Sequence, residues 1–501
     1  MKTTSLLPAI CISAMLLTGL FYQQGIGLNL LIFDTLFIIW LFITKQIKLQ
    51  TANQIISVSG FLVTSIFTVV TYSIYAYVIH FLALFVFVGM LNYNQARSFI
   101  TALAIAFVSI LSSQAAFVQE IYSRKIHKNA FGKLLWKSRI FLVPVLIITV
   151  FVSIYSFSNN VFGSMVGDVG LFIQNGFIFV FERLNFSLIF TFIFCSFSSV
   201  FLIIRSKNTT LAQQDAGANE QFMRHAKKNK RYFRLTALKS EYKAGAFLLL
   251  VLNALILIAN TLDIYWVWFN FEWVGQTLKQ FVHEGTYLLI LSILISIALV
   301  LYFFRGNLNF YKRNKFLKLL SYIWLGQNAV LAISVMIRNY WYIEYFALAY
   351  KRIGVLIFLT LTVYGLYTVL IKIRDKKSAF YLFRTNAIAV FVALVLTSAV
   401  PWDSLIAQFN FAHANQSYLH LEYLSKLSDK TLPALDRSAF EMTPIETFQK
   451  ETFDIDHDDM TYGEYRIKIN TRTASFKEKW EAKNILSWNL PEYLAYKSFA
   501  K

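Results

Sequence analysis

The chain has 501 residues, of which 57% are hydrophobic, 17% aromatic and only 15% charged, and its formal net charge is +20. Soluble domains carry about 25% charged residues, so this composition excludes an ordinary cytosolic enzyme, a disordered chain and a disulfide scaffold. We therefore expect a membrane protein. Its two cysteines, Cys11 and Cys195, both lie in apolar runs, and we expect no disulfide between them.

Twelve apolar runs follow one another through the first 400 residues. A helix that crosses a bilayer needs roughly 20 mainly apolar residues. The first run lacks a small-residue cleavage site, so we interpret it as an uncleaved span and not as a signal peptide. The runs predict an all-α polytopic membrane protein with about 11–12 helical spans, and they cover 5–21, 27–43, 55–71, 74–91, 99–118, 140–157, 187–204, 246–264, 287–304, 319–337, 353–371 and 385–400.

Lys and Arg are concentrated in alternate loops, which predicts the orientation of the chain in a bacterial cytoplasmic (inner) membrane. We expect four basic loops to lie in the cytoplasm beside anionic lipid, namely 119–139, 205–243, 305–318 and 372–384. We do not expect these loops to bind nucleic acid. The loops expected outside are 158–186, 265–286 and 338–352. Aromatic residues typical of a membrane interface adjoin two of these outer loops, namely Trp266, Trp268, Trp273, Tyr340, Trp341 and Tyr342.

In the first quarter of the chain, the number of predicted membrane crossings does not agree with the charges of the loops. Lys2, Lys45, Lys48 and Arg97 favour a cytoplasmic N-terminus, but five crossings before residue 119 would put the next basic loop outside. Run 99–118 is the most polar of the five, and we expect it to lie at the interface or to re-enter the membrane. The alternative is an N-terminus outside.

The composition changes at Pro401. The last 101 residues hold 15 acidic and 12 basic side chains, a net charge of −3, which leaves +23 for the first 400. Trp402-Asp403-Ser404 predicts a helix start with Asp403 or Ser404 as its cap. Residues 465–471 alternate as in a strand. We expect a small extracytoplasmic tail, mainly helical or α/β, and divide the chain into 1–118 (N-terminal membrane helices), 119–400 (helical core) and 401–501 (tail).

Three ordered boxes lie in the second half of the chain: Arg-Asn-Tyr-Trp-Tyr-Ile-Glu at 338–344, Asp-Ser-Leu-Ile-Ala-Gln-Phe-Asn at 403–410, and Leu-Glu-Tyr-Leu-Ser-Lys-Leu followed by Pro-Ala-Leu within 421–435. Together they resemble the bacterial integral-membrane family grouped as domain of unknown function 4173, which is related to the 4153 group. On that resemblance the family's polar positions are Arg338, Tyr342, Glu344 and Arg352, and Ala347 and Ala349 stand where the family has glycine and threonine. The resemblance implies no activity, because none is assigned to the family.

The first group of candidate functional residues lies at the outer face. We predict a cluster that clamps an anionic headgroup or docks the tail, formed by Arg338, Tyr342, Glu344 and Arg352 with Asp403 and Asn410 of the tail. The structural alternative is that Glu344 pairs with an arginine so that neither charge is uncompensated near lipid.

Further polar residues are candidates elsewhere. Asp34 lies within an apolar run and is the intramembrane candidate, with no basic partner evident in a neighbouring run. His80 is interpreted as a hydrogen-bonded core histidine with no carboxylate nearby. Asp454, Asp456 and Asp458 begin like a calcium loop, but glycine and glutamate are missing at its sixth and twelfth positions. We therefore expect a solvated acidic turn, and neither a metal nor a cofactor.

The sequence thus favours a multi-pass, non-catalytic envelope component that contacts the lipid bilayer. Its tail and the 338–352 loop are expected to form one docking surface for a protein or lipid partner. The alternatives are a small-molecule or ion transporter and a membrane-embedded enzyme that modifies lipid or glycan. The enzyme alternative requires an outward cavity lined by two or more acids.

Overall fold

The computed structural model describes residues 6–47, 49–123, 142–158, 162–168, 171, 185–223, 235–271, 275–453 and 460–499. Every regular element in these ranges is a helix, apart from an isolated β-bridge between Gln221 and Lys377. Within the same ranges, nine helices are long and apolar enough to cross a membrane, and α1 and α2 are shorter apolar helices. The all-α prediction is confirmed.

Each of the twelve apolar runs coincides with a helix. Several helices begin where a side chain caps the backbone, as at Thr51 and Gln54, which form a capping box, and at Ser73 and Ser378. The helices are α1 (Leu6–Phe21), α2 (Leu28–Ile43), α3 (Ala52–Val70), α4 (Ile74–Asn92), α5 (Phe99–Ser123), α7 (Leu142–Ser158), α9 (Phe186–Ile203), α11 (Leu235–Asp263), α12 (Gly275–Phe303), α13 (Lys315–Phe346), α14 (Tyr350–Arg374) and α15 (Ala379–Ser398).

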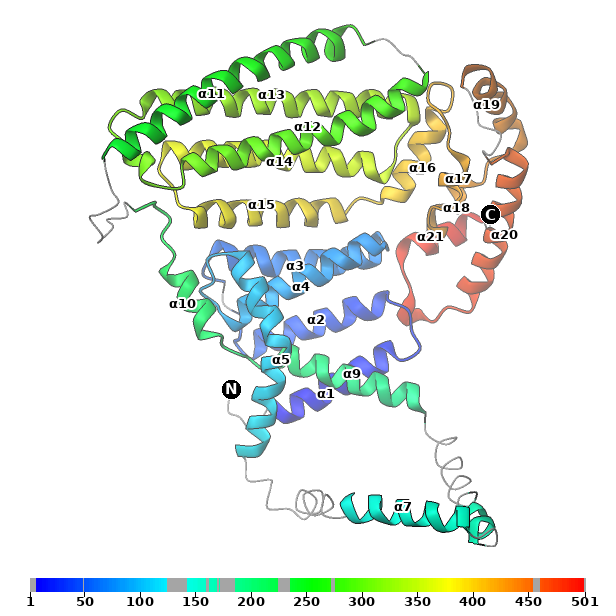
Figure 1. The fold of residues 1–501 in the computed structure, drawn as a ribbon. Helices are drawn as coiled ribbons and strands as arrows, with labels where there is room; N and C mark the ends of the chain where they lie inside the picture. The colour runs from blue at the N-terminus through cyan, green and yellow to red at the C-terminus, as the bar shows by residue number, and fades with distance from the viewer. Residues whose placement is uncertain are drawn as a thin grey trace.

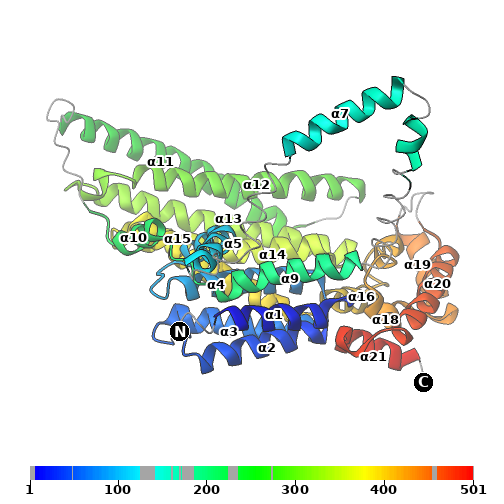
Figure 2. The same ribbon diagram turned by 90° about the horizontal axis from the view of Figure 1, so that it is seen from below.

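Most of the described membrane helices pack in two groups (Figures 1 and 2). One core is shared by α1–α4 and α9, with Phe61 and Phe87 fully buried in it. A second core is shared by α11–α14, around Leu249 and Leu317. Helix α15 joins the groups, because Phe391 packs against residues of α4 and α5.

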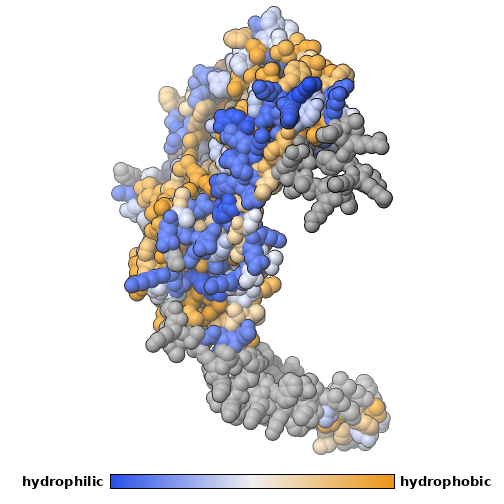
Figure 3. All heavy atoms as spheres, turned by 90° about the vertical axis from the view of Figure 1, so that its left-hand side faces the viewer, coloured by the Kyte–Doolittle hydropathy of each residue, from blue (hydrophilic) through white to orange (hydrophobic). Residues whose placement is uncertain are grey.

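The basic loops described in the structure meet at one end of the helices, which we call the loop end. The backbone of Glu220 and Phe222 bonds to the turn 376–378, and Arg97 binds Asp215 and Glu220. Also at this end are α10 (Thr209–Gly217) and a 3-10 turn η5 (Asn307–Phe310). Figure 3, which looks onto the loop end, shows hydrophilic residues gathered there with hydrophobic residues beside them.

Helix α5 runs along the loop end and across the direction of its neighbours (Figures 1 and 2). Thr101 bonds to Asp215 at 2.9 Å, Ser112 to Ser206 at 2.6 Å, and Ser113 to the carbonyl of Ile204 at 3.2 Å. These turns of α5 therefore lie beside segment 204–218, whereas Gln114, further along, bonds to the carbonyl of Phe197 in α9. Helix α5 is long and apolar enough to span. The interpretation that run 99–118 does not cross stays a prediction.

The tail occupies the opposite end of the bundle, which we call the tail end. It is built from α16 (Trp402–Ala412), α17 (Leu421–Leu424), η6 (Asp429–Thr431), α18 (Leu432–Leu435), α19 (Ala439–Thr452), α20 (Tyr462–Glu481), η7 (Ile485–Ser487) and α21 (Leu490–Phe499). Its hydrophobic core also contains Ile343, Leu348 and Ile353 from the ends of α13 and α14. The tail therefore completes its core on the membrane helices.

Three local expectations were wrong. Residues 465–471 belong to α20, because Tyr465 and Ile469 are buried at helical spacing whereas Ile467 is 69% exposed. The predicted outer loop 338–352 is mostly helix, since α13 continues to Phe346 and α14 begins at Tyr350. Helix α16 has Pro401 at its N-cap and no side-chain cap, because Asp403 is bound elsewhere.

Candidate functional site

The turn between α13 and α14 is held by Asn410 of the tail. The side-chain oxygen of Asn410 accepts from the backbone N–H of Leu348 at 2.8 Å, and its amide donates to the carbonyl of Leu348 at 3.0 Å. Both residues are buried, so this double hydrogen bond satisfies backbone groups that water does not reach.

Arg352 binds backbone carbonyls of the same turn. Its guanidinium lies 4.5 Å from the ring centroid of Tyr342 and donates to the carbonyls of Phe346 and Ala347. The carbonyl of Arg352 in turn accepts from Asn339 at 3.1 Å. The aromatic face and the carbonyl groups together stabilise a cation where the helices end.

Arg338 and Glu344, expected as possible partners of each other, have different partners. Arg338 forms a buried ion pair with Asp263, the last residue of α11. Glu344 contacts Tyr340 through its side chain, and its carbonyl accepts from Ser417 at 2.5 Å. The expectation that Glu344 pairs with an arginine therefore fails for Arg338, because Asp263 faces it from the neighbouring helix.

Ala347 adopts a backbone conformation that side chains disfavour, with φ 60° and ψ −166°. This region is essentially restricted to glycine and costs another residue about 1–3 kcal/mol. Ala349, two residues on, is extended at φ −148°. The turn thus has a strained position at the site where the resembling family carries glycine.

We expect Ala347→Gly to preserve or raise the melting temperature of the purified protein, because relief of strain offsets the lost methyl group and the greater chain entropy. Ala349→Gly is the matched control, and we expect it to lower stability by about 0.5–1 kcal/mol, since glycine there adds only entropy cost. Thermal unfolding in detergent measures both variants. A larger loss at 347 than at 349 would contradict the proposed strain.

Asp403 is the centre of a buried contact between the tail and two turns of the membrane body. It accepts from Tyr350 at 2.5 Å and from Ser428 at 2.5 Å, and Lys430 Nζ lies 3.5 Å from its Oδ2. Lys430 also donates to the carbonyls of Thr71 and Tyr72 at 2.8 and 2.9 Å. Burial lowers the pKa of Lys430, and the Asp403 carboxylate partly offsets this effect.

A cavity of about 720 Å³ lies beside this contact, between the tail and the turn that joins α3 to α4. Charges of both signs and five aromatic side chains line it: Asp403, Asp429, Glu492, Lys426, Lys430, Arg472, Tyr72, Tyr75, Tyr77, Tyr350 and Trp402. Each of the three carboxylates is within ion-pair distance of a cation, respectively Lys430, Arg472 and Lys483.

A second polar site lies inside the first helix group. Asp34 of α2 is 2% exposed, and its Oδ2 accepts from Ser65 of α3 at 2.6 Å. His80 Nε2 of α4 lies 3.3 Å from the same oxygen without making a hydrogen bond, and Nδ1 lies 3.3 Å from Thr64 Oγ1. The expectations that Asp34 has no basic partner and that His80 has no carboxylate nearby were therefore wrong.

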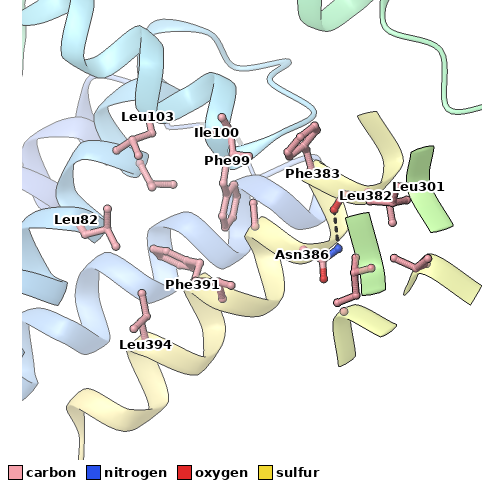
Figure 4. Close-up of a pocket in the computed structure, with 16 residues that line it drawn as sticks. Leu82, Phe99, Ile100, Leu103, Leu301, Leu382, Phe383, Asn386, Phe391 and Leu394 are labelled. Atoms are coloured by element: carbon pink, nitrogen blue, oxygen red, sulfur yellow. Dashed lines mark hydrogen bonds between the residues drawn. The ribbon is translucent and has the colours of Figure 1, made fainter. Parts of the chain in front are cut away.

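Another cavity, of about 520 Å³, lies where the two helix groups meet (Figure 4). Asn386 is the only polar residue among its lining side chains, which come from α4, α5, α12, α14 and α15. The amide of Asn386 is bonded to Thr368 and to the carbonyl of Leu382, both at 2.9 Å. Such a lining suits acyl chains and provides no chemistry for catalysis.

The structure therefore brings three of the predicted residues, Asn410, Arg352 and Tyr342, together at the α13–α14 turn. Asp403 faces the cavity of about 720 Å³, which we call the junction cavity, and Asp34 lies in the bundle. Sequence reasoning missed Asp263 and Lys430, which carry no local motif. Asp454, Asp456 and Asp458 lie outside the described residues, and the described residues contain no cluster of three metal-ligating side chains.

The lengths and hydropathy of the described helices define a polytopic helical membrane protein. Residues 36–438 match the family model Domain of unknown function (DUF4153), and the chain belongs to this family. The predicted relationship is thereby confirmed at the level of the 4153 group, and the narrower 4173 assignment stays a prediction. No curated protein and no solved structure matches the chain.

Proposed function

We propose that the protein is a non-catalytic component of the bacterial cytoplasmic membrane whose tail lies outside the cell and whose junction cavity binds the headgroup of a membrane lipid. The distribution of charge supports the orientation: the described basic loops share the loop end, and the tail, with its net negative charge, occupies the other end. The observation that carries the binding proposal is the cavity of about 720 Å³ at the helix ends.

The lining of the cavity favours a lipid headgroup over a folded protein partner. Tyrosine and tryptophan settle at the level of headgroups, and five such side chains line this cavity. Ile74, which also lines it, is 82% exposed and offers a contact for the adjoining acyl chain. A concave site between the tail and helix ends admits a headgroup more readily than a flat protein surface.

The proposal changes the role of the predicted docking cluster. Asn410 and Asp403 fix the tail to the helices and Arg352 holds the α13–α14 turn, so they shape the site instead of forming its free surface. Lys426 is the most exposed of the described cations that line the cavity, with a side chain 63% exposed and paired to Glu422 four residues before it. It is therefore the group that we assign to the phosphate of the lipid.

We expect Lys426→Gln to weaken binding of phosphatidylglycerol about fivefold, since one lysine near a membrane surface contributes about 1 kcal/mol. Native mass spectrometry of the purified full-length protein, titrated with phosphatidylglycerol, measures the change. Lys450→Gln is the matched control, because Lys450 is equally exposed and likewise pairs with a glutamate four residues before it, away from the cavity. Equal losses in both variants, or no binding above the detergent background, would refute the proposal.

The two alternatives differ in their support. The enzyme alternative required a cavity lined by two or more acids, and the junction cavity has three. Each of the three is bound to a cation, which does not suit a general acid, so we retain a non-catalytic role. Transport is the second candidate function, because Asp34 meets His80 inside the bundle.

A further inference from the structure

We propose that Asp34 and His80 form a proton-binding pair through which the helix bundle carries protons between its tail end and its loop end. An ionisable pair inside an apolar bundle is costly to maintain, and Asp34 and His80 are 2% and 0% exposed. Their facing atoms, Asp34 Oδ2 and His80 Nε2, are 3.3 Å apart. At this separation the two groups can hold one proton in turn, so that the site gains and loses a single charge.

A row of buried polar side chains on α3 and at its C-cap extends from this pair toward both ends of the bundle. The residues recur at helical spacing and are all 5% exposed or less: Gln54, Ser57, Thr64, Ser65, Thr68 and Thr71. The backbone carbonyl of Thr71 accepts from Lys430, which lines the junction cavity. The row therefore runs from the loop end, where Gln54 bonds to the carbonyl of Asn94, to the cavity beside the tail.

The pair lies nearer the tail end. Asp34 and His80 each follow the first residue of their helix by six positions, which corresponds to a depth of roughly 9 Å. On this side, Thr68 and Thr71 are the members of the polar row that lie between the pair and the turn at the cavity. Protons therefore enter from the tail end by the shorter route.

Aromatic rings close the route toward the loop end. Phe61 lies between Ser57 and Thr64 along α3, stacks on Phe87 with ring centroids 5.0 Å apart, and stacks on His80 at 5.3 Å. A ring offers no hydroxyl group to pass a proton on. Phe61 thus sets the barrier between the pair and the inner part of the polar row.

The proton balance is simple. A proton from the tail end converts the Asp34 carboxylate to a carboxyl group, and its transfer to His80 Nε2 restores the carboxylate. The imidazolium then loses one proton from Nδ1, beside Thr64 Oγ1, toward Ser57 and Gln54. The proton left on Nε2 moves to Nδ1 by tautomer exchange before the next transfer. The residues packed around the pair are Ser65, Thr64 and Phe61 of α3 and Phe81 of α4. At the tail end the row reaches the cavity lined by the titratable groups Lys430, Tyr72, Tyr77 and Glu492.

The full-length protein in liposomes of phosphatidylethanolamine and phosphatidylglycerol tests this proposal, with a pH-sensitive dye inside and an imposed pH gradient. We expect proton flux above that of protein-free liposomes, a loss of tenfold or more in Asp34→Asn and in His80→Gln, and a severalfold gain in Phe61→Ala. Asp375→Asn and His413→Gln are the matched controls, because these residues lie in an exposed turn and in the tail.

Ser65→Ala keeps the test decisive if either main variant does not fold. It removes one hydroxyl that donates to Asp34, and we expect a severalfold lower flux from a protein that still folds, with a modestly lower melting temperature. Wild-type flux no greater than that of empty liposomes would overturn the proposal, as would wild-type flux in a folded Asp34→Asn or Ser65→Ala variant. The result is independent of lipid binding at Lys426, which lies in the tail.

Discussion

Lys430→Met is expected to lower the stability of the protein by about 3–5 kcal/mol, the range observed when one member of a buried ion pair is removed. The side chain of Lys430 is 2% exposed, and its ammonium group contacts Asp403 and the carbonyls of Thr71 and Tyr72. Without it, a buried carboxylate and two backbone carbonyls lose a donor. We expect the tail to separate from the α3–α4 turn, and thermal unfolding in detergent with limited proteolysis of the tail measures both effects.

A double variant separates the uncompensated charge from general disruption. Asp403→Asn combined with Lys430→Met removes both charges, so we expect it to recover part of the stability that Lys430→Met loses. Lys450→Met, at an exposed pair with Glu446, is the control and should change little. A double variant less stable than the sum of its single variants would show that the pair does not act through charge.

Asn410→Ala is expected to cost roughly 2–4 kcal/mol, because it leaves both the N–H and the carbonyl of Leu348 without their side-chain partner. These groups are buried in the core that the tail shares with the ends of α13 and α14. Faster proteolytic release of the tail from the full-length protein, with a lower melting temperature, is the measured outcome.

Asn415→Ala is the matched control for this variant. Asn415 lies five residues further along the tail and is exposed, so its loss should leave both readings unchanged. If Asn410→Ala resisted proteolysis as well as Asn415→Ala, the double hydrogen bond would not be what fixes the tail.

The helix positions were predictable because hydropathy is a local property of consecutive residues. All twelve apolar runs became helices, including run 99–118, which forms α5. The buried polar row of α3 was also visible as helical spacing within an apolar run, although sequence reasoning did not use it.

The alternation of residues 465–471 was misleading because two periods fit it. A spacing of four residues puts Tyr465 and Ile469 on one face of a helix and also on one face of a strand. Packing against the rest of the tail selected the helix. Likewise, the polar side chains of 338–346 suggested a loop, but Arg338 and Asn339 are buried within α13 because Asp263 and the carbonyl of Arg352 bind them.

The sequence by itself determined that the chain forms a set of apolar helices, with its cations in alternate loops and with an acidic tail. Only the tertiary structure decided which polar groups meet. Asp34 and His80 are 46 positions apart, and Arg338 and Asp263 are 75 positions apart. Contacts of about 3 Å between such groups depend on how whole helices pack, because a membrane helix buries its polar side chains only where a neighbour presents a partner.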